Sequence, residues 1–174
     1  LCQGNYVEGM SQHGIAIRQN MHNNHYGITI DSNQIVNCNR SIMVQYLWKN
    51  LKITNNLINT DTRAGTQMIS IQANQSSGTA SYIDGIDISG NMGIQNQDSG
   101  SSNSFIYFTN SRNAVYNELN ISNNFAQARG SVAMSQAIIL GGSATSPSAA
   151  PNWGLGSTKK AFVTLNNNKF ENVT

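Results

Sequence analysis

The sequence predicts an all-β protein folded as a parallel β-helix, a solenoid in which about five turns each contain three short strands. Three observations predict this fold. One apolar motif recurs along the chain, a second motif alternates with it in strict order, and a third apolar element follows most copies of the first. No stretch has the spacing of an amphipathic helix, so we expect few helices.

The first motif is an apolar-x-apolar strand that ends in an asparagine. Its asparagines are 28, 23, 35, 33 and 44 residues apart, and an irregular period of a few tens of residues is typical of a solenoid. Alternate residues point to opposite faces, so Ile28 and Ile30 are predicted to face inward and Thr29 outward. The copies are Ile28–Asn33, Leu51–Asn56, Ile86–Asn91, Leu119–Asn124 and Val163–Asn168, with a truncated Cys2–Asn5 at the start.

An asparagine at every turn has a physical reason. Asparagine tolerates left-handed backbone and bonds to the peptide groups beside it. Side-chain amides stacked over successive turns can also bond to one another, as in cross-β ladders. We therefore expect one column of asparagines, made of Asn5, Asn33, Asn56, Asn91, Asn124 and Asn168.

The second motif adds another strand to each turn, because each copy falls between two copies of the first. Its copies are Ile15–Ile17, Ile42–Val44, Ile69–Ile71, Ile106–Phe108 and Ile138–Leu140. The third strand is predicted from the apolar residues that follow most of the asparagines, which are Ile35–Val36, Leu57–Ile58, Met92 with Ile94, Phe125 and Phe170. Stacked strands bury columns of Ile, Leu and Val, and each turn satisfies its backbone hydrogen bonds through its neighbours.

The composition fits a solenoid and excludes several function classes. Charged residues make up 10% of the chain and the net charge is +2, which is too small and too scattered to indicate a nucleic-acid partner. There is no run of 18 or more apolar residues and no signal-peptide pattern, so no membrane insertion is expected. The length fits one domain, residues 1–174. Both ends fall in mid-turn without a capping element, which favours a segment of a longer β-helix.

The two cysteines are predicted to remain free. Alignment of Asn5 with the other ladder asparagines places Cys2 in the inward column with Ile30, as a small buried hydrophobe. Cys38 falls in a turn and does not stack on Cys2, so a disulfide is not favoured.

The repeated Φ-x-Φ-x-(N/S/G)-N motif resembles the ladders of right-handed β-helices in the pectin-lyase-like superfamily. The long polar loops and weak charge most resemble bacteriophage tailspikes and capsule depolymerases. The resemblance implies recognition of a bacterial surface polysaccharide and its cleavage by glycoside hydrolysis or a lyase reaction. It also implies a homotrimer located in the virion tail, with a secreted or cell-surface bacterial protein as the alternative.

Carbohydrate chemistry is sought among the eight acidic residues, because glycoside hydrolysis uses two carboxyl groups at a fixed separation. The densest pair is Asp84 and Asp87, which are the candidate catalytic residues. In the alternative interpretation Asp87 pairs with Lys52, which lies in the same outward column one turn earlier, and Asp84 closes a turn.

No metal or other cofactor is predicted. No turn column stacks several acids, so a calcium site of the lyase type is not expected. The three histidines are not spaced with the cysteines as zinc ligands would be. His13 aligns with Arg40 of the next turn, which predicts a polar stack on the surface.

Residues in and beside the loops are the candidate substrate-binding residues, because sugar rings stack their apolar faces on exposed aromatics. Tyr46, Trp48 and Lys49 lie in one short stretch, Tyr82 ends a polar loop, and Trp153 lies in the longest insertion. Packing of the aromatics over the coil is the alternative. Most added length falls in loops, and a groove is expected beside the segments 73–83, 95–104 and 141–160.

One outward column is unusually apolar for the face of a rod. Either covering loops or contacts between subunits would bury it, and a trimer with its β-helices side by side would use it. Two function classes stay open: a polysaccharide-active enzyme, and a non-enzymatic shaft or adhesin that binds glycan or presents loops. The column consists of Ala16, Met43, Ser70, Tyr107 and Ile139.

Overall fold

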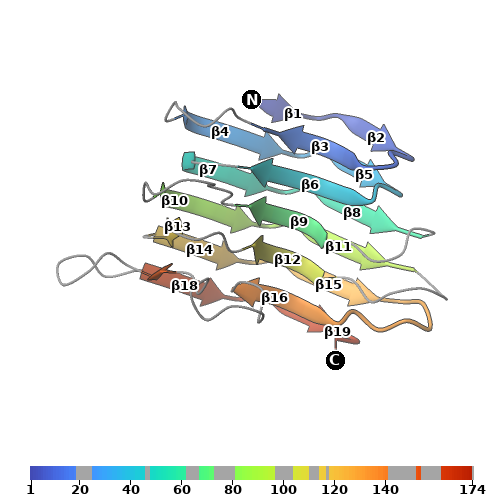
Figure 1. Cartoon of the computed structure of the whole chain (residues 1–174). Helices are drawn as coiled ribbons and strands as arrows, with labels where there is room; N and C mark the ends of the chain where they lie inside the picture. The colour runs from blue at the N-terminus through green and yellow to red at the C-terminus, as the bar shows by residue number, and fades with distance from the viewer. Residues whose placement is uncertain are drawn as a thin grey trace.

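The computed structural model describes residues 1–18, 25–45, 48–61, 67–72, 81–96, 104–109, 114–116, 118–140, 152–153 and 162–173. Within these residues every regular element is a β-strand, and every ladder between strands is parallel. The strands stack as a right-handed parallel β-helix, the hand that parallel crossover connections almost always take (Figure 1). The predicted fold class is confirmed.

Three parallel sheets form the walls of the coil, and each turn of the chain passes through them in the same order. The first sheet contains β1 (Cys2–Gln3), β4 (His25–Asp31), β7 (Trp48–Thr54), β10 (Ser81–Ser89), β14 (Glu118–Ser122) and β18 (Phe162–Asn166), extended by β13 (Ala114–Tyr116) and β17 (Asn152–Trp153). The second contains β2 (Tyr6–Glu8), β5 (Gln34–Val36), β8 (Leu57–Thr60), β11 (Met92–Gln95), β15 (Phe125–Ala128) and β19 (Lys169–Glu171). The third contains β3 (His13–Ile17), β6 (Arg40–Gln45), β9 (Gln67–Gln72), β12 (Ser104–Thr109) and β16 (Gln136–Leu140).

The pairing registers are those that the repeated motifs predict. Ile30 pairs with Ile53, which pairs with Ile88, and Ile88 pairs with Ile121. All four are buried, and with the inward residues of the other two sheets they form one continuous core. At the two ends of this column, Cys2 is half-buried and Leu165 is exposed.

Both cysteines have free thiols, as the sequence predicts. Cys2 pairs in register with Ile30 in the inward column. Cys38 is fully buried in the core, where its Sγ lies 3.4 Å from the carbonyl oxygen of Val36.

The predicted asparagine column forms a ladder of hydrogen bonds at the corner between the first and second sheets. Asn56 is typical. Its Oδ1 accepts from the backbone N–H of Asn33 at 3.0 Å and from Asn33 Nδ2 at 2.9 Å. Its Nδ2 donates to Asn91 Oδ1 at 2.9 Å and to the carbonyl oxygen of Ile30 at 3.0 Å. The same four bonds recur at Asn33, Asn91 and Asn124, so these buried amides are satisfied.

The left-handed backbone lies one residue earlier than the sequence predicts. The ladder asparagines are not left-handed; the residue before each one is, and this explains why the motif has Asn, Ser or Gly there. Short polar residues and glycine adopt positive φ at least cost. The left-handed column contains Gly4, Ser32, Asn55, Gly90, Asn123 and Asn167, with φ between 51° and 67°.

Candidate functional site

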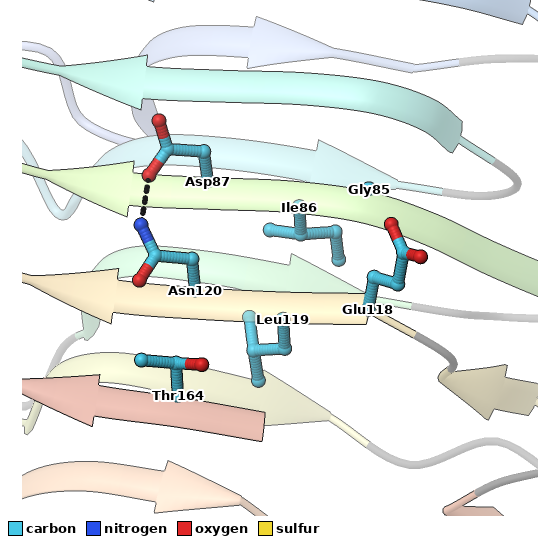
Figure 2. Close-up of a pocket in the computed structure, with 7 residues that line it drawn as sticks. All are labelled: Gly85, Ile86, Asp87, Glu118, Leu119, Asn120 and Thr164. Carbon is cyan, nitrogen blue, oxygen red and sulfur yellow. Dashed lines mark hydrogen bonds between the residues drawn. The ribbon is translucent and has the colours of Figure 1, made fainter. Parts of the chain in front are cut away.

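A depression of about 350 Å³ lies on the outward face of the first sheet, over β10, β14 and β18 (Figure 2). It contains two of the eight acidic side chains. Its lining consists of Gly85, Ile86, Asp87, Glu118, Leu119, Asn120 and Thr164.

The backbone of β10 leaves room for this depression at Gly85. Gly85 has a φ of +66°, and Asn50 in the neighbouring strand β7 has a φ of +57°. A Cβ on Gly85 would lie 2.8 Å from Oδ1 at the end of the Asn50 side chain, so the left-handed conformation is the main reason that favours glycine here.

Asp87 and Glu118 bring two carboxylates to this face from neighbouring strands. Asp87 pairs in register with Asn120, and its Oδ1 accepts a hydrogen bond from Asn120 Nδ2 at 2.8 Å. Glu118 lies two residues before Asn120 and is exposed; Figure 2 shows its side chain reaching toward β10 beside Gly85. Strand spacing and rise place the Cα atoms of Asp87 and Glu118 diagonally, about 8 Å apart.

Glu118 was missed as a partner for Asp87 when the sequence was read alone. It immediately precedes the motif Leu119–Asn124, so it lies one residue outside the repeated segment on which the alignment of turns was based. One signal in the sequence could have identified Glu118. Ile86 pairs with Leu119, so the residues before them, Gly85 and Glu118, come opposite one another.

The expected partner of Asp87 also differs. Asp87 does pair in register with Lys52, but no ion pair joins their side chains in the described part of the chain, and the carboxylate bonds instead to Asn120 one turn later. Asp84 lies in β10, in register with Lys49, which in turn pairs with Tyr26. The side chain of Asp84 is outside the described residues, so the pairing of Asp84 with Asp87 stays a prediction.

The backbone places four of the five predicted substrate-binding residues in the first sheet or its extension. Trp48 and Lys49 begin β7. Tyr82 lies in β10 and Trp153 in β17, while Tyr46 falls outside the described residues.

The strands of Tyr82 and Trp153 are joined in one sheet by a strand, β13, that the sequence did not predict. The first half of β10 pairs with β13, and β13 pairs with β17. Ile83 is thereby in register with Tyr116, and Tyr116 with Trp153. Along the chain, the first half of β10 leads to Asp87 in the same strand, and β13 leads to β14, which carries Glu118.

The three loops expected to border one groove do not share one edge of the coil. The segments 73–83 and 141–160 both connect the third sheet to the first. The segment 95–104 instead connects β11 of the second sheet to β12 of the third. Along the chain, only the first two lead into the sheet that carries the depression.

The apolar outward column of the third sheet is partly covered by the chain itself. Met43 and Ser70 are completely buried, although Met43 is not part of the central core cluster. Covering segments of the same chain, one of the two expected explanations, therefore account for these two positions. Ala16 is exposed, and Tyr107 and Ile139 are half-buried.

The second sheet carries an apolar outward column instead. Leu57, Met92 and Phe125 lie in register on neighbouring strands, and Met92 is 41% exposed. Tyr6, 60% exposed, holds the same register position in the first turn but is separated from Leu57 by the exposed Gln34. Lys169 closes the column with its Nζ 5.7 Å from the centre of the Phe125 ring. The sequence pattern for the third strand of each turn was too short to predict which of its residues face outward.

Within the described residues, no group of three or more His, Cys, Asp or Glu side chains gathers as metal ligands would. The same part of the chain has no helix long and apolar enough to cross a membrane. Comparison with known proteins gives no match to any protein-family model, curated protein or solved structure.

Proposed function

We propose that this β-helix recognises a bacterial surface polysaccharide along the outward face of its first sheet and cleaves it by glycoside hydrolysis. The observation that carries the proposal is the placement of Asp87 and Glu118 on neighbouring strands of one depression. Most glycoside hydrolases use two carboxyl groups that flank the sugar, one as the acid and the other as the base or nucleophile.

The surroundings of the two carboxylates support a sugar ligand. Asn120 and Thr164 line the depression between and beside them and offer amide and hydroxyl groups. Tyr116 and Trp153 are in register with each other in the ribbon of β10, β13 and β17 that adjoins the depression along the chain. Sugar sites combine apolar contact surface with a few polar groups in this way.

The two carboxyl groups have different roles in this proposal. We assign Asp87, which is half-buried and accepts a hydrogen bond from Asn120, as the base. Glu118 is then the acid.

The test is incubation of the protein with a panel of capsular and O-antigen polysaccharides, followed by size-exclusion chromatography and a reducing-end assay. We expect Asp87→Asn and Glu118→Gln each to lower cleavage by about 100-fold or more. Glu8→Gln removes the same charge from the second sheet and is the matched control. If Asp84→Asn abolishes cleavage while Glu118→Gln does not, the pair is the one expected from the sequence, and the site proposed here is wrong.

A non-enzymatic shaft or adhesin is the second candidate. It is favoured by the exposure of Glu118, which no described side chain bonds or encloses. Binding to a polysaccharide without release of oligosaccharides across the whole panel would support this candidate and overturn the hydrolase.

Assembly as a homotrimer, in a virion tail or on a bacterial surface, is part of the same proposal. The apolar outward column of the second sheet is the face that supports it, because Leu57, Met92 and Phe125 remain partly exposed in the single chain. Copies of this chain packed side by side would cover it.

A further inference from the structure

Two arginines at the first two strands of the third sheet form no ion pair with any acidic residue that the structure describes. Arg18 directly follows β3 and Arg40 begins β6. Arg40 Nε donates to Gln67 Oε1 at 3.0 Å, and Arg18 Nη2 lies 3.4 Å from His13 Nδ1. Both contacts are to neutral groups, and the ion pair found in the described residues, Lys169–Glu171, is on the second sheet in the last turn.

The acids of the neighbouring turns have other partners. Glu8 accepts the hydroxyl of Tyr6 at 2.8 Å on the second sheet. Asp31 accepts bonds from Gln3, Ser32, Thr54 and Asn55 on the first. The segment 19–24, which follows Arg18, contains no acidic residue. Asp61, which follows β8, accepts a hydrogen bond from Asn96 Nδ2 at 2.7 Å. Among the described residues, therefore, no carboxylate forms an ion pair with either arginine.

A pocket of about 450 Å³ lies against this cluster. The small Ala16 forms part of its wall, whereas the next turn has the larger, buried Met43 at the same register position. Polar groups suited to an anion surround the space, a guanidinium, a hydroxyl and an amide among them. The lining consists of Met10, Ser11, Gln12, His13, Ala16 and Arg18.

The surroundings of His13 are positively charged. It pairs in register with Arg40, as the sequence predicts. Its pKa is lowered first by burial, then by the charges of Arg18 and Arg40, and no carboxylate counteracts them. Because Nδ1 faces a guanidinium donor, Nε2 carries the proton in the neutral ring. That Nε2 is buried without a hydrogen-bond partner.

We propose that this pocket, with Arg18 in its wall and Arg40 beside His13, binds an oxyanion such as the carboxylate of an acidic sugar. A planar guanidinium fork matches a carboxylate, sulfate or phosphate better than a neutral hydroxyl. The assignment to a sugar rests on the proposed function and narrows its substrate to acidic glycans. The assignment to an oxyanion stands independently of it.

The experiment measures equilibrium binding to the whole chain by calorimetry, with three probes. They are hexagalacturonate, the same hexamer with its carboxyl groups reduced to alcohols, and sodium sulfate. We expect hexagalacturonate to bind, with affinity falling as salt is raised, and the reduced hexamer not to bind at this pocket. The double variant R18Q/R40Q should lose about tenfold or more in affinity.

Matched variants distinguish the contribution of the planar guanidinium group from that of its positive charge. Lys52→Gln removes one positive charge from the exposed face of the first sheet and should leave the affinity within about twofold. R18K/R40K keeps both positive charges but lacks the planar guanidinium groups, so its affinity for hexagalacturonate should lie between those of R18Q/R40Q and wild type. A melting curve for each variant confirms that it is folded.

Equal binding of the two hexamers, or equal affinity of wild type and R18Q/R40Q, would overturn the proposal. Arginine-dependent binding of sulfate without binding of hexagalacturonate would support the oxyanion site and overturn its assignment to a glycan. Because binding is measured without cleavage, a negative result in the hydrolysis assay leaves this test unaffected.

Discussion

The ring of Phe105 lies against Gly93, so closely that a Cβ on Gly93 would fall 2.5 Å from two carbons of the ring. Gly93 belongs to the inward column of the second sheet, between Ile58 and Ala126. Phe105 comes from the start of β12 and is fully buried. Its ring fills the space that the small residues leave, and its centre lies 6.4 Å from that of Phe170.

Gly93→Ala should therefore destabilise the fold by overpacking, by about 1–3 kcal/mol. The added methyl group also meets Met68 Sδ at 2.7 Å, so neither neighbour leaves it free space. Urea unfolding measures the change in the free energy of unfolding. In the background of Phe105→Leu the same substitution should cost less, because the ring is gone. An equal cost in both backgrounds would show that Phe105 is not the obstacle.

The asparagine ladder should tolerate no interruption in its middle. Asn56→Ala removes the acceptor of two Asn33 donors and the donor to Ile30, all buried, so we expect a loss of about 3 kcal/mol in the free energy of unfolding. Asn123→Gly is the control, because Asn123 is exposed and left-handed with a φ of +56°, and glycine should change stability by less than about 0.5 kcal/mol. Similar losses in the two variants would contradict a special role of the ladder.

Stability should fall in acid partly through Asp31. Hydrogen bonds from Thr54, then Ser32 and Asn55, hold its pKa below the usual 3.8. Because the folded pKa is the lower one, this contribution to stability is complete above the unfolded pKa and is lost as the pH falls through the folded one. Melting temperatures between about pH 2 and 6 should drop more steeply below about pH 4 in wild type than in Asp31→Asn. If the melting temperatures of wild type and Asp31→Asn fall in parallel with pH, Asp31 does not contribute to the loss of stability in acid.

The apolar outward column of the second sheet should control self-association. Met92→Lys combined with Leu57→Lys places two charges in the middle of that column and should convert an oligomer into a monomer, which light scattering after size-exclusion chromatography detects. Thr29→Lys with Thr164→Lys, on the outward face of the first sheet, is the control and should leave the mass unchanged. A wild-type chain that is already monomeric would rule out the homotrimer for this chain.

Residues whose position depends on the repeat could be predicted from the sequence. The alternation in Ile28–Ile30 and its four later copies gave the inward columns and the registers. The alignment of His13 with Arg40 and of Asp87 with Lys52 followed from the same repeat.

Residues outside the repeat could not be placed in this way. Met68 adjoins the inward Ile69 and would face outward by strict alternation, yet both are buried in the core cluster, as are Phe105 and Ile106. Strict alternation therefore does not hold near the starts of β9 and β12. Glu118 and Tyr116 were missed for a related reason, since each lies just before a motif and after an insertion.

The sequence alone determined the coil, its three walls and its asparagine column, because these depend on short local patterns that each turn repeats. Tertiary structure decided which charged side chains meet. Asp87 bonds to Asn120 of the next turn and shares a depression with Glu118, while Arg18 returns to His13 across the small Ala16. These contacts depend on side-chain reach between turns and on gaps left by small residues, which a one-dimensional repeat does not encode.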